Sequence, residues 1–281
     1  RELTPISRLV FPDIAASRQL LLIQSEVLVK CSALPDTLAA VKIQPSLSII
    51  IPVGPNETEH LQLVQRLAGF PVVEFYATCQ IVLSGCGLLQ PEPSSTSING
   101  VNCIQVNGPA GRAAQLNRGV AASSGRCLWL LHADSRPTSG AVDCAVAFAT
   151  TCHGSAPGGE LGWFPLSYTA DGPRLAALNA IGANLRSRML RLPFGDQGWL
   201  LRRDTFNTLG GFDEQFGRGE DLDFIRRARH TGIRLSRQKA VIATSARRYR
   251  AHGWLRTTLA HLSLTLRLWL KSSRKPRKAS N

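Results

Sequence analysis

The fold is best predicted from one segment in the middle of the chain, Gly125-Arg126-Cys127-Leu128-Trp129-Leu130-Leu131-His132-Ala133-Asp134-Ser135-Arg136-Pro137. Its apolar run, Cys127 to Leu131, predicts a short buried strand, and the polar residues after it predict a loop. Side chains two apart in an extended segment point the same way, so His132 and Asp134 can share a side. Ligands of open α/β sheets bind at the carboxyl ends of the strands. Asp134 therefore either holds a divalent cation against a diphosphate or only caps a turn or a following helix.

Other apolar runs predict a parallel sheet around this strand. The run Leu47-Ser48-Ile49-Ile50-Ile51-Pro52 is typical of a strand buried on both faces, and further strands are expected at 79–83 and 102–106. Residues 56–68 and 112–121 have helical spacing. This alternation predicts an α/β fold with a doubly wound, mainly parallel sheet, and loops that meet in a crevice.

Three further segments have less regular patterns. Residues 90–97 are rich in Pro and Ser and predict a loop, and residues 154–166 predict an irregular loop with an edge strand. The segment Pro193 to Trp199 is dense in glycine and polar groups. It is either a substrate-facing loop or an ordinary turn.

Two helices are expected further along the chain. One is predicted to pack on the core through a stripe of apolar residues at helical spacing, Leu175, Leu178, Ile181, Leu185 and Met189. Another is expected to begin near Glu220 or Asp221, because acidic groups favour a helix N-terminus. These acids either only complement the helix dipole, or one of them is a general base at the mouth of the crevice.

The composition indicates a globular protein with a strongly basic end. Hydrophobic residues make up 44% of the 281 residues, which is ordinary for a protein with a core. Of the 33 Lys and Arg residues, 16 lie from Arg226 onward, where the sequence has no Asp or Glu. This block predicts phosphate-bearing partners: a nucleotide diphosphate, an anionic membrane surface or nucleic acid. The seven cysteines have no Cys-x-x-Cys spacing, so we expect a reducing, cytoplasmic compartment.

The C-terminal residues predict a basic amphipathic helix followed by a cationic tail. One face of this helix is expected to carry Leu255, Leu259, Leu262, Leu266 and Trp269. The helix either packs on the preceding domain or docks on the inner face of a membrane as a peripheral element. We therefore divide the chain into an N-terminal extension without a sustained period (1–45), an α/β domain (46–253), and the basic helix with its tail (254–281).

Several separated motifs resemble those of one enzyme family. In chain order they are Ile49-Ile50-Ile51-Pro52-Val53, Gly111-Arg112-Ala113-Ala114-Gln115-Leu116-Asn117, Leu131-His132-Ala133-Asp134, Pro193-Phe194-Gly195-Asp196-Gln197-Gly198, Gly210-Gly211-Phe212, Glu220-Asp221 and Thr244-Ser245-Ala246-Arg247-Arg248-Tyr249. The set is similar to family 2 glycosyltransferases with the GT-A fold, and closest to a bacterial subgroup of unknown substrate. The resemblance covers roughly Pro45 to Arg256.

The resemblance implies an inverting transfer of a sugar from a nucleotide-diphosphate sugar to a hydroxyl acceptor, with Mg2+ or Mn2+ across the donor diphosphate. Asp134 matches the last acid of the family's Asp-x-Asp-like element and His132 stands where the first would be, so both are expected metal ligands. Asp221 matches the catalytic base, with Glu220 as its neighbour. The expected donor contacts are Pro52, Ser84, Arg112, Asp134, Arg247, Arg248 and His252. The expected acceptor-side residues are Asp196, Gln197 and Gly198.

The sequence departs from the family at the end of the second strand. The family usually has an Asp there, whereas this chain has Ser84, which can form a hydrogen bond but has no charge. We expect a UDP-sugar as donor, and a lipid-linked acceptor would explain membrane docking. A catalytically silent, nucleotide-sugar-binding relative is an alternative, because of Ser84 and His132. A nucleic-acid-binding protein is disfavoured, because the basic residues have few aromatic residues among them and form no recognisable binding module.

Overall fold

A computed structural model describes residues 46–70, 79–86, 94–151 and 159–272 of the chain. All of these residues belong to one compact unit, Gln44–Asn281. The predicted N-terminal extension lies outside the described residues, as do Cys31 and Cys152. Of the other five cysteines, which lie in the described part, three are buried, as the apolar surroundings in the sequence predicted, and two are half-buried.

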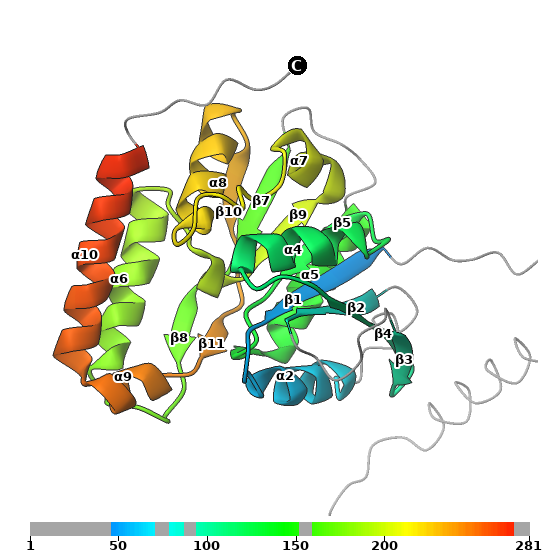
Figure 1. Cartoon of the computed structure of the whole chain (residues 1–281), viewed down its shortest axis with the longest axis horizontal. Helices are drawn as coiled ribbons and strands as arrows, with labels where there is room; N and C mark the ends of the chain where they lie inside the picture. The colour runs from blue at the N-terminus through cyan, green and yellow to red at the C-terminus, as the bar shows by residue number, and fades with distance from the viewer. Residues whose placement is uncertain (1–45, 71–78, 87–93, 152–158, 273–281) are drawn as a thin grey trace, which may run out of the picture. The chain divides into compact units, whose positions relative to one another are not determined.

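The described residues form an eight-stranded sheet in the order β10-β7-β9-β5-β1-β2-β4-β3 (Figure 1). Four neighbouring strands in this sheet are parallel, which confirms the predicted doubly wound core. They are β5 (Cys127–Leu130), β1 (Leu47–Val53), β2 (Cys79–Gly85) and β4 (Val101–Asn107).

Side chains of β1 alternate between two cores, one on each face of the sheet. Ile49 and Ile51 lie in a cluster with residues of α2 (Glu59–Ala68) and α5 (Ser139–Thr151). Ile50 lies in a second cluster. The helices that contribute to this second cluster are α4 (Arg112–Ala121), α7 (Arg203–Thr208) and α8 (Glu220–His230). The apolar run of β1 is continuous because helices cover both of its faces.

Two predictions about the sheet are wrong. The segment expected as a loop contains β3 (Ser94–Ile98), which pairs antiparallel with β4 across a turn at Asn99 and Gly100, both with positive φ. Its polar, exposed side chains give no apolar signal. The expected edge strand is β7 (Glu160–Trp163), and it lies inside the sheet. It pairs with β9 (Trp199–Arg202) on one side and β10 (Arg234–Arg237) on the other, so β10 is the edge.

A small second sheet supports the loop after β5. It consists of β6 (Ser135–Pro137), β11 (Ile242–Thr244) and β8 (Leu166–Tyr168) in that order. The antiparallel pairing of β6 with β11 brings the residue after Asp134 opposite Thr244, close to where α9 (Arg247–His252) begins. This pairing joins two distant motifs of the sequence.

The apolar stripe expected to pack on the core is exposed instead. It lies on α6 (Ala176–Met189), whose buried residues are the small Ala176, Ala180 and Ser187. The leucines of α10 (Trp254–Ser272) that were expected to share a face are exposed as well. Figure 1 shows α6 and α10 side by side at the left of the view. No helix in the described part of the chain combines the length and apolar character needed to span a bilayer.

Candidate active site

Asp134 lies in the loop between β5 and β6, at the carboxyl edge of the main sheet. The loop is fixed at its start by the Leu131 amide, which donates to the Ile50 carbonyl at 3.0 Å, and it turns through a Ser135 to His132 backbone hydrogen bond of 3.1 Å. Burial raises the pKa of the Asp134 carboxyl, while the nearby guanidiniums of Arg247 and Arg248 lower it. A half-buried carboxylate facing two cations is an arrangement that fits charged ligands.

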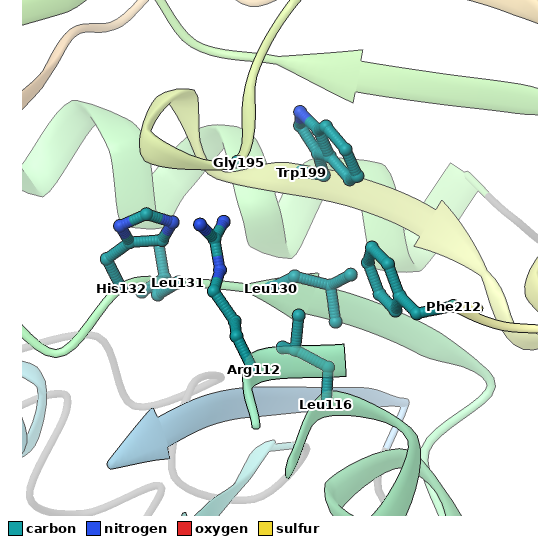
Figure 2. Close-up of a pocket in the computed structure, with 8 residues that line it drawn as sticks. All are labelled: Arg112, Leu116, Leu130, Leu131, His132, Gly195, Trp199 and Phe212. Atoms are coloured by element: carbon teal, nitrogen blue, oxygen red, sulfur yellow. The ribbon is translucent and has the colours of Figure 1, made fainter. Parts of the chain in front are cut away.

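His132 lies two residues earlier in the same loop, beside Arg112. Figure 2 shows the Arg112 guanidinium next to the imidazole, with Gly195 close to both. A Cβ atom on Gly195 would clash with Arg112 Nη2 and lie 3.2 Å from His132 Nε2, so glycine lets the guanidinium take this position without having to shift. Burial, together with Arg112 and Arg248, holds the pKa of His132 well below its ordinary value, so the ring is neutral at pH 7.

The cavity between these residues is too small for a nucleotide. Its volume is about 10 Å³, which is at the limit for one water molecule. The His132 Nε2 atom is buried beside this cavity and has no hydrogen-bond partner in the described structure. Buried polar atoms are normally paired, so this imidazole nitrogen is a candidate ligand contact.

Arg112 is held by an acid from the predicted helix N-terminus. Arg112 is the first residue of α4, and its Nε atom lies 3.3 Å from Oε1 of Glu220, the first residue of α8. The Glu220 side chain is only 7% exposed, against 33% for Arg112. Burial raises the pKa of Glu220, although Arg112 lowers it. Glu220 therefore faces the guanidinium and is screened from solvent.

Asp221 occupies a different position from its neighbour. It is half-buried, and its Oδ2 atom accepts a hydrogen bond of 3.3 Å from the Gly195 amide. Its Oδ1 atom accepts a bond of 2.8 Å from the Leu222 amide. These contacts place the carboxylate against the loop that contains the Pro193-Phe194-Gly195-Asp196-Gln197-Gly198 motif.

Gln197 holds this loop from inside through hydrogen bonds. Gln197 is fully buried, and its Oε1 atom accepts hydrogen bonds from Ser187 Oγ at 2.5 Å and from the Phe194 amide at 3.1 Å. Gly198 follows with φ 54°, and its space is bounded by Ile242 and Leu131. Gln197 and Gly198 therefore shape the loop from within, although the sequence predicted that they face the acceptor.

Asp196 is the loop residue that lies among charged groups. Its Oδ1 atom is buried without a hydrogen-bond partner in the described structure. Burial raises its pKa, Arg186 lowers it, and Asp221 raises it further. The Arg186 guanidinium stacks 3.6 Å from the centre of the Phe194 ring. Asp196 and Asp221 thus form an acidic pair next to one buried cation.

Arg247 is engaged by two acids that follow β1, one in the loop and one at the start of α2. Its Nη2 atom bonds Glu57 Oε2 at 2.8 Å, and its Nη1 atom lies 3.1 Å from Glu59 Oε1. The chain before it is held by Asp171, whose Oδ1 atom accepts a hydrogen bond of 2.8 Å from the Ala246 amide. Arg248 is exposed and is an electrostatic neighbour of both His132 and Asp134.

The positions of three further expected donor contacts are described, but they stay predictions as donor contacts. Ser84 is fully buried, pairs with Pro52 in the register of β1 and β2, and lies near Gly119 of α4. Pro52 is a buried residue of β1. His252 is exposed at the end of α9. The structure brings together Arg112, His132, Asp134, Asp196, Glu220, Asp221 and Arg248, with Arg247 at one side.

The donor atoms of the site fit a divalent cation only together with a ligand. Within the described ranges, no group of three or more His, Cys, Asp or Glu side chains could hold a metal ion. Asp134 offers one carboxylate, and Mg2+ is commonly bound by one or two carboxylates plus substrate phosphates. The guanidinium beside His132 opposes a cation at that nitrogen. The residues therefore fit a cation shared between Asp134 and a bound diphosphate.

Arg186 and Glu57 were missed in the sequence. Glu57 follows β1, and the rule that places ligands at the carboxyl ends of parallel strands could have found it. Arg186 lies within the apolar pattern of α6, and a charged residue in such a pattern was the available signal. Glu57 forms an ion pair with Arg247, and Arg186 lowers the pKa of Asp196. Both therefore act on residues that the sequence had predicted for the site.

Comparisons with known proteins show structural likeness only. No family model matches the sequence, and no curated protein matches it. S. aureus TarS 1–349 in complex with UDP has a TM-score of 0.53 and 15% identity, over 72% of this chain and 60% of that chain. The mannosyltransferase PcManGT from Pyrobaculum calidifontis, in complex with GDP-Man and Mn2+, has a TM-score of 0.58 and 13% identity, over 94% of this chain and 75% of that chain.

These likenesses confirm the fold predicted from the sequence. The chain has a mixed α/β fold with a large, mainly parallel central sheet, and this is the GT-A fold. It spans less than two thirds of the length of TarS 1–349.

Proposed function

We propose that this chain transfers a sugar from a nucleotide-diphosphate sugar to a hydroxyl acceptor. The observation that carries this proposal is the set of groups at the carboxyl edge of the sheet. Asp134, Asp196 and Asp221 approach one another there, and guanidiniums flank them. Cations that match phosphate oxygens and a carboxylate that can accept a proton are the two needs of such a transfer.

The ligands of the similar structures agree with this donor class. TarS 1–349 has been crystallised with UDP and with UDP-GlcNAc, and PcManGT with GDP-Man and Mn2+. UDP, UDP-GlcNAc and GDP-Man all contain a nucleoside diphosphate. Their bases differ, so the base selected by this chain stays a prediction, and we keep a UDP-sugar as first choice.

In the proposed reaction the basic residues bind the donor diphosphate. Arg112 and Arg248 approach the site from α4 and α9, and guanidinium forks match phosphate oxygens. When bound, Mg2+ or Mn2+ would neutralise charge on the leaving diphosphate, with Asp134 as its carboxylate ligand. His132 was the second ligand predicted from the sequence, but the Arg112 guanidinium beside it opposes a cation there, so we do not assign it to the metal. Arg247 is already paired with Glu57, so we assign it to holding the loop near Asp134.

Asp221 is proposed as the general base. Its carboxylate takes the proton of the acceptor hydroxyl while that oxygen attacks the anomeric carbon, and the bond from this carbon to the diphosphate oxygen breaks. A single displacement of this kind inverts the anomeric centre. Two facts support Asp221 over Glu220: it is half-buried, whereas Glu220 is turned toward Arg112. Glu220 is then a positioning residue for Arg112.

The acceptor side is proposed to be the loop with Asp196. Its carboxyl oxygen is unpaired in the described structure, and Asp221 is close enough to raise its pKa. Family 2 membership, the hexosyl type of the sugar, a lipid-linked acceptor and a cytoplasmic location stay predictions about the whole protein.

Thermal stability in the presence of nucleotides tests the proposal without a known acceptor. A ligand that binds only the folded chain at 100 times its Kd adds about 2.7 kcal/mol of stability, which raises Tm by about 5–10 °C for a domain of this size. We expect one nucleoside diphosphate to give such a shift, and Mn2+ or Mg2+ to enlarge it. The full chain should then transfer sugar from the matching donor.

Variants separate the metal from the nucleotide. Asp134→Asn should remove the gain caused by the metal, while Asp143→Asn, on the exposed side of α5, should keep it. A metal gain that persists in Asp134→Asn refutes that assignment. Absence of a shift with every nucleoside diphosphate and nucleotide sugar refutes the proposed function.

A further inference from the structure

Two helices on one side of the molecule are joined through polar contacts. Trp254 Nε1 of α10 donates a hydrogen bond of 2.6 Å to Asn179 Oδ1 of α6, and Asn179 Nδ2 donates one of 3.0 Å to Thr258 Oγ1. Figure 1 shows the two helices running beside each other over most of their length. The two helices therefore present a common surface.

This surface carries a large set of exposed apolar side chains. Each of them is between 53% and 69% exposed, and together we call them the apolar strip: Leu178, Ile181, Leu185, Met189, Leu255, Leu259, Leu262 and Leu266. Monomeric soluble proteins rarely expose contiguous apolar areas of this kind, and such areas mark interaction sites.

The strip faces away from the core on both helices. Successive residues of an α-helix are turned by about 100°. On α6 this places Leu178 and Leu185 opposite the buried Ala180 and Ser187. On α10 the four leucines recur every three or four residues, on the side away from the buried Thr257. Because Asn179 and Thr258 fix the contact between the helices, the two rows of apolar residues point outward together.

Cationic side chains border the strip, and acids are missing from its helices. Exposed guanidiniums lie on α6, just beyond its ends, and along the polar side of α10: Arg174, Arg188, Arg191, Arg256 and Arg267. Within the described structure none of these five forms an ion pair. The sequence has no Asp or Glu from 172 to 195, and none after Asp223. The border therefore has one sign of charge.

A basic groove adjoins the end of the strip. It has a volume of about 480 Å³ and is lined by Trp163, Ser187, Arg188, Arg191, Leu235 and Arg237. Three guanidiniums and no acid line it, and Arg188 and Arg191 flank Met189 in the sequence. Such a groove suits a phosphate group next to an apolar surface.

We propose that the apolar strip docks on an anionic phospholipid surface, with its leucines in the acyl boundary and its arginines on the lipid phosphates. Charge decides between this partner and a second copy of the chain. A two-fold contact would set the same cationic border against itself, which is repulsive, whereas anionic lipid neutralises it. An apolar face bordered by Arg is also the composition of helices that lie in a membrane interface. This inference is independent of the proposed sugar transfer.

Sedimentation with vesicles tests the proposal on the full chain. We expect binding to vesicles of phosphatidylcholine mixed with phosphatidylglycerol, little binding to phosphatidylcholine alone, and weaker binding as salt is raised. Leu178→Glu on α6 and Leu262→Glu on α10 should each weaken binding by about tenfold, because each removes one apolar anchor and adds a repelled charge. Arg267→Gln should weaken binding to the anionic vesicles.

Matched controls come from α2. Leu61 is 57% exposed, and Arg66 is exposed on the same helix, so Leu61→Glu and Arg66→Gln should bind as the unchanged chain does. All of these positions are exposed, and unchanged Tm values would show that the variants are folded. Failure to bind anionic vesicles overturns the proposal, whether light scattering then finds a dimer or a monomer. Equal binding by Leu178→Glu and the unchanged chain overturns the joint role of α6.

Discussion

Replacement of Glu220 by Gln tests the division of roles between two adjacent acids that residue spacing alone left equivalent and that the family resemblance separated by matching Asp221 to the base. Glu220 is nearly buried and faces Arg112, whereas Asp221 is half-buried and lies against the Gly195 amide. If Glu220 positions the guanidinium and Asp221 takes the proton, the two variants must differ in kind. Glu220→Gln should lower stability and nucleotide affinity, and Asp221→Asn should lower the transfer rate alone.

The stability loss can be bounded from the geometry of the ion pair. Breaking a fully buried pair costs about 3–5 kcal/mol, and breaking an exposed one costs about 1 kcal/mol or less. Arg112 is one third exposed, and its Nε atom lacks hydrogen-bond geometry toward the carboxylate, so the pair lies near the lower bound. Gln also avoids the cost of burying a charge. We expect a loss of about 1–2 kcal/mol, or about 2–8 °C in Tm.

The assay combines thermal unfolding, nucleotide binding and transfer rate for both variants. Arg112→Gln completes a double-mutant cycle. The double variant should lose less free energy of unfolding than the sum of the losses in the two single variants, because both remove the same ion pair. For Asp221→Asn we expect a rate lower by about 10²–10⁴-fold with Tm and nucleotide binding unchanged. If Glu220→Gln keeps its Tm and nucleotide affinity but loses transfer, Glu220 is the base and the assignment of that role to Asp221 is wrong.

Three further outcomes follow from the site. Because the pKa of Asp196 is raised, the folded chain holds this proton more tightly than the unfolded chain. The free energy of unfolding should therefore fall as pH rises from about 3.9 through the raised pKa. Denaturation series at several pH values should not show this fall for Asp196→Asn. Burial opposes the lowering of the pKa of Asp171, yet hydrogen bonds such as that from Ser245 prevail, so Asp171 contributes to the free energy of unfolding above about pH 3.9 and this contribution is lost as pH falls through the lowered pKa; Asp171→Asn should unfold more easily at pH 7, and its difference from the unchanged chain should shrink as pH falls below about 3.9. Gly198→Ala should cost about 1–3 kcal/mol by calorimetry, because φ is 54° and the new Cβ atom would lie 2.6 Å from Ile242 Cδ1.

The central sheet could be predicted because its strands are buried on both faces. The runs of β1, β2 and β5 are buried along their whole length, and together with the partly buried β4 they gave the parallel core. β3 could not be found in this way, because it is an edge strand whose side chains are polar and exposed. Its turn at Asn99 and Gly100 was the available signal.

The spacing of apolar residues could not predict which face of α6 packs on the core. An apolar stripe fixes which residues share a helix face, but only the neighbours of the helix determine whether that face is covered. Here the packed face has the small Ala176, Ala180 and Ser187, which let the helix approach the sheet closely. The rule for amphipathic helices assumes that the apolar face is buried and the polar face is exposed, and for α6 this assumption gave the wrong buried face.

The sequence predicted the site as separate motifs, and only the structure shows which charged side chains of these motifs lie next to one another. The order of motifs indicated Asp134, Arg112 and Asp221, and the structure brings these together from β5, α4 and α8. Arg186 and Glu57 act on these groups from segments where spacing gave no functional pattern. Long-range pairing of charges depends on distances between elements, which a pattern within one element does not contain.

The two proposals meet in α6, and this makes them separable. One side of the helix fastens the site loop through Ser187 and Gln197, and the other side carries half of the apolar strip. A bilayer on that strip would lie roughly 10 Å, one helix diameter, from the loop with Asp196. Substitution of Asp221 should then leave vesicle binding unchanged, and Leu178→Glu should leave the nucleotide-induced rise in Tm unchanged. If Leu178→Glu also abolished that rise, the strip would be acting on the fold of the loop, and a docking role restricted to the outer face of α6 would be wrong.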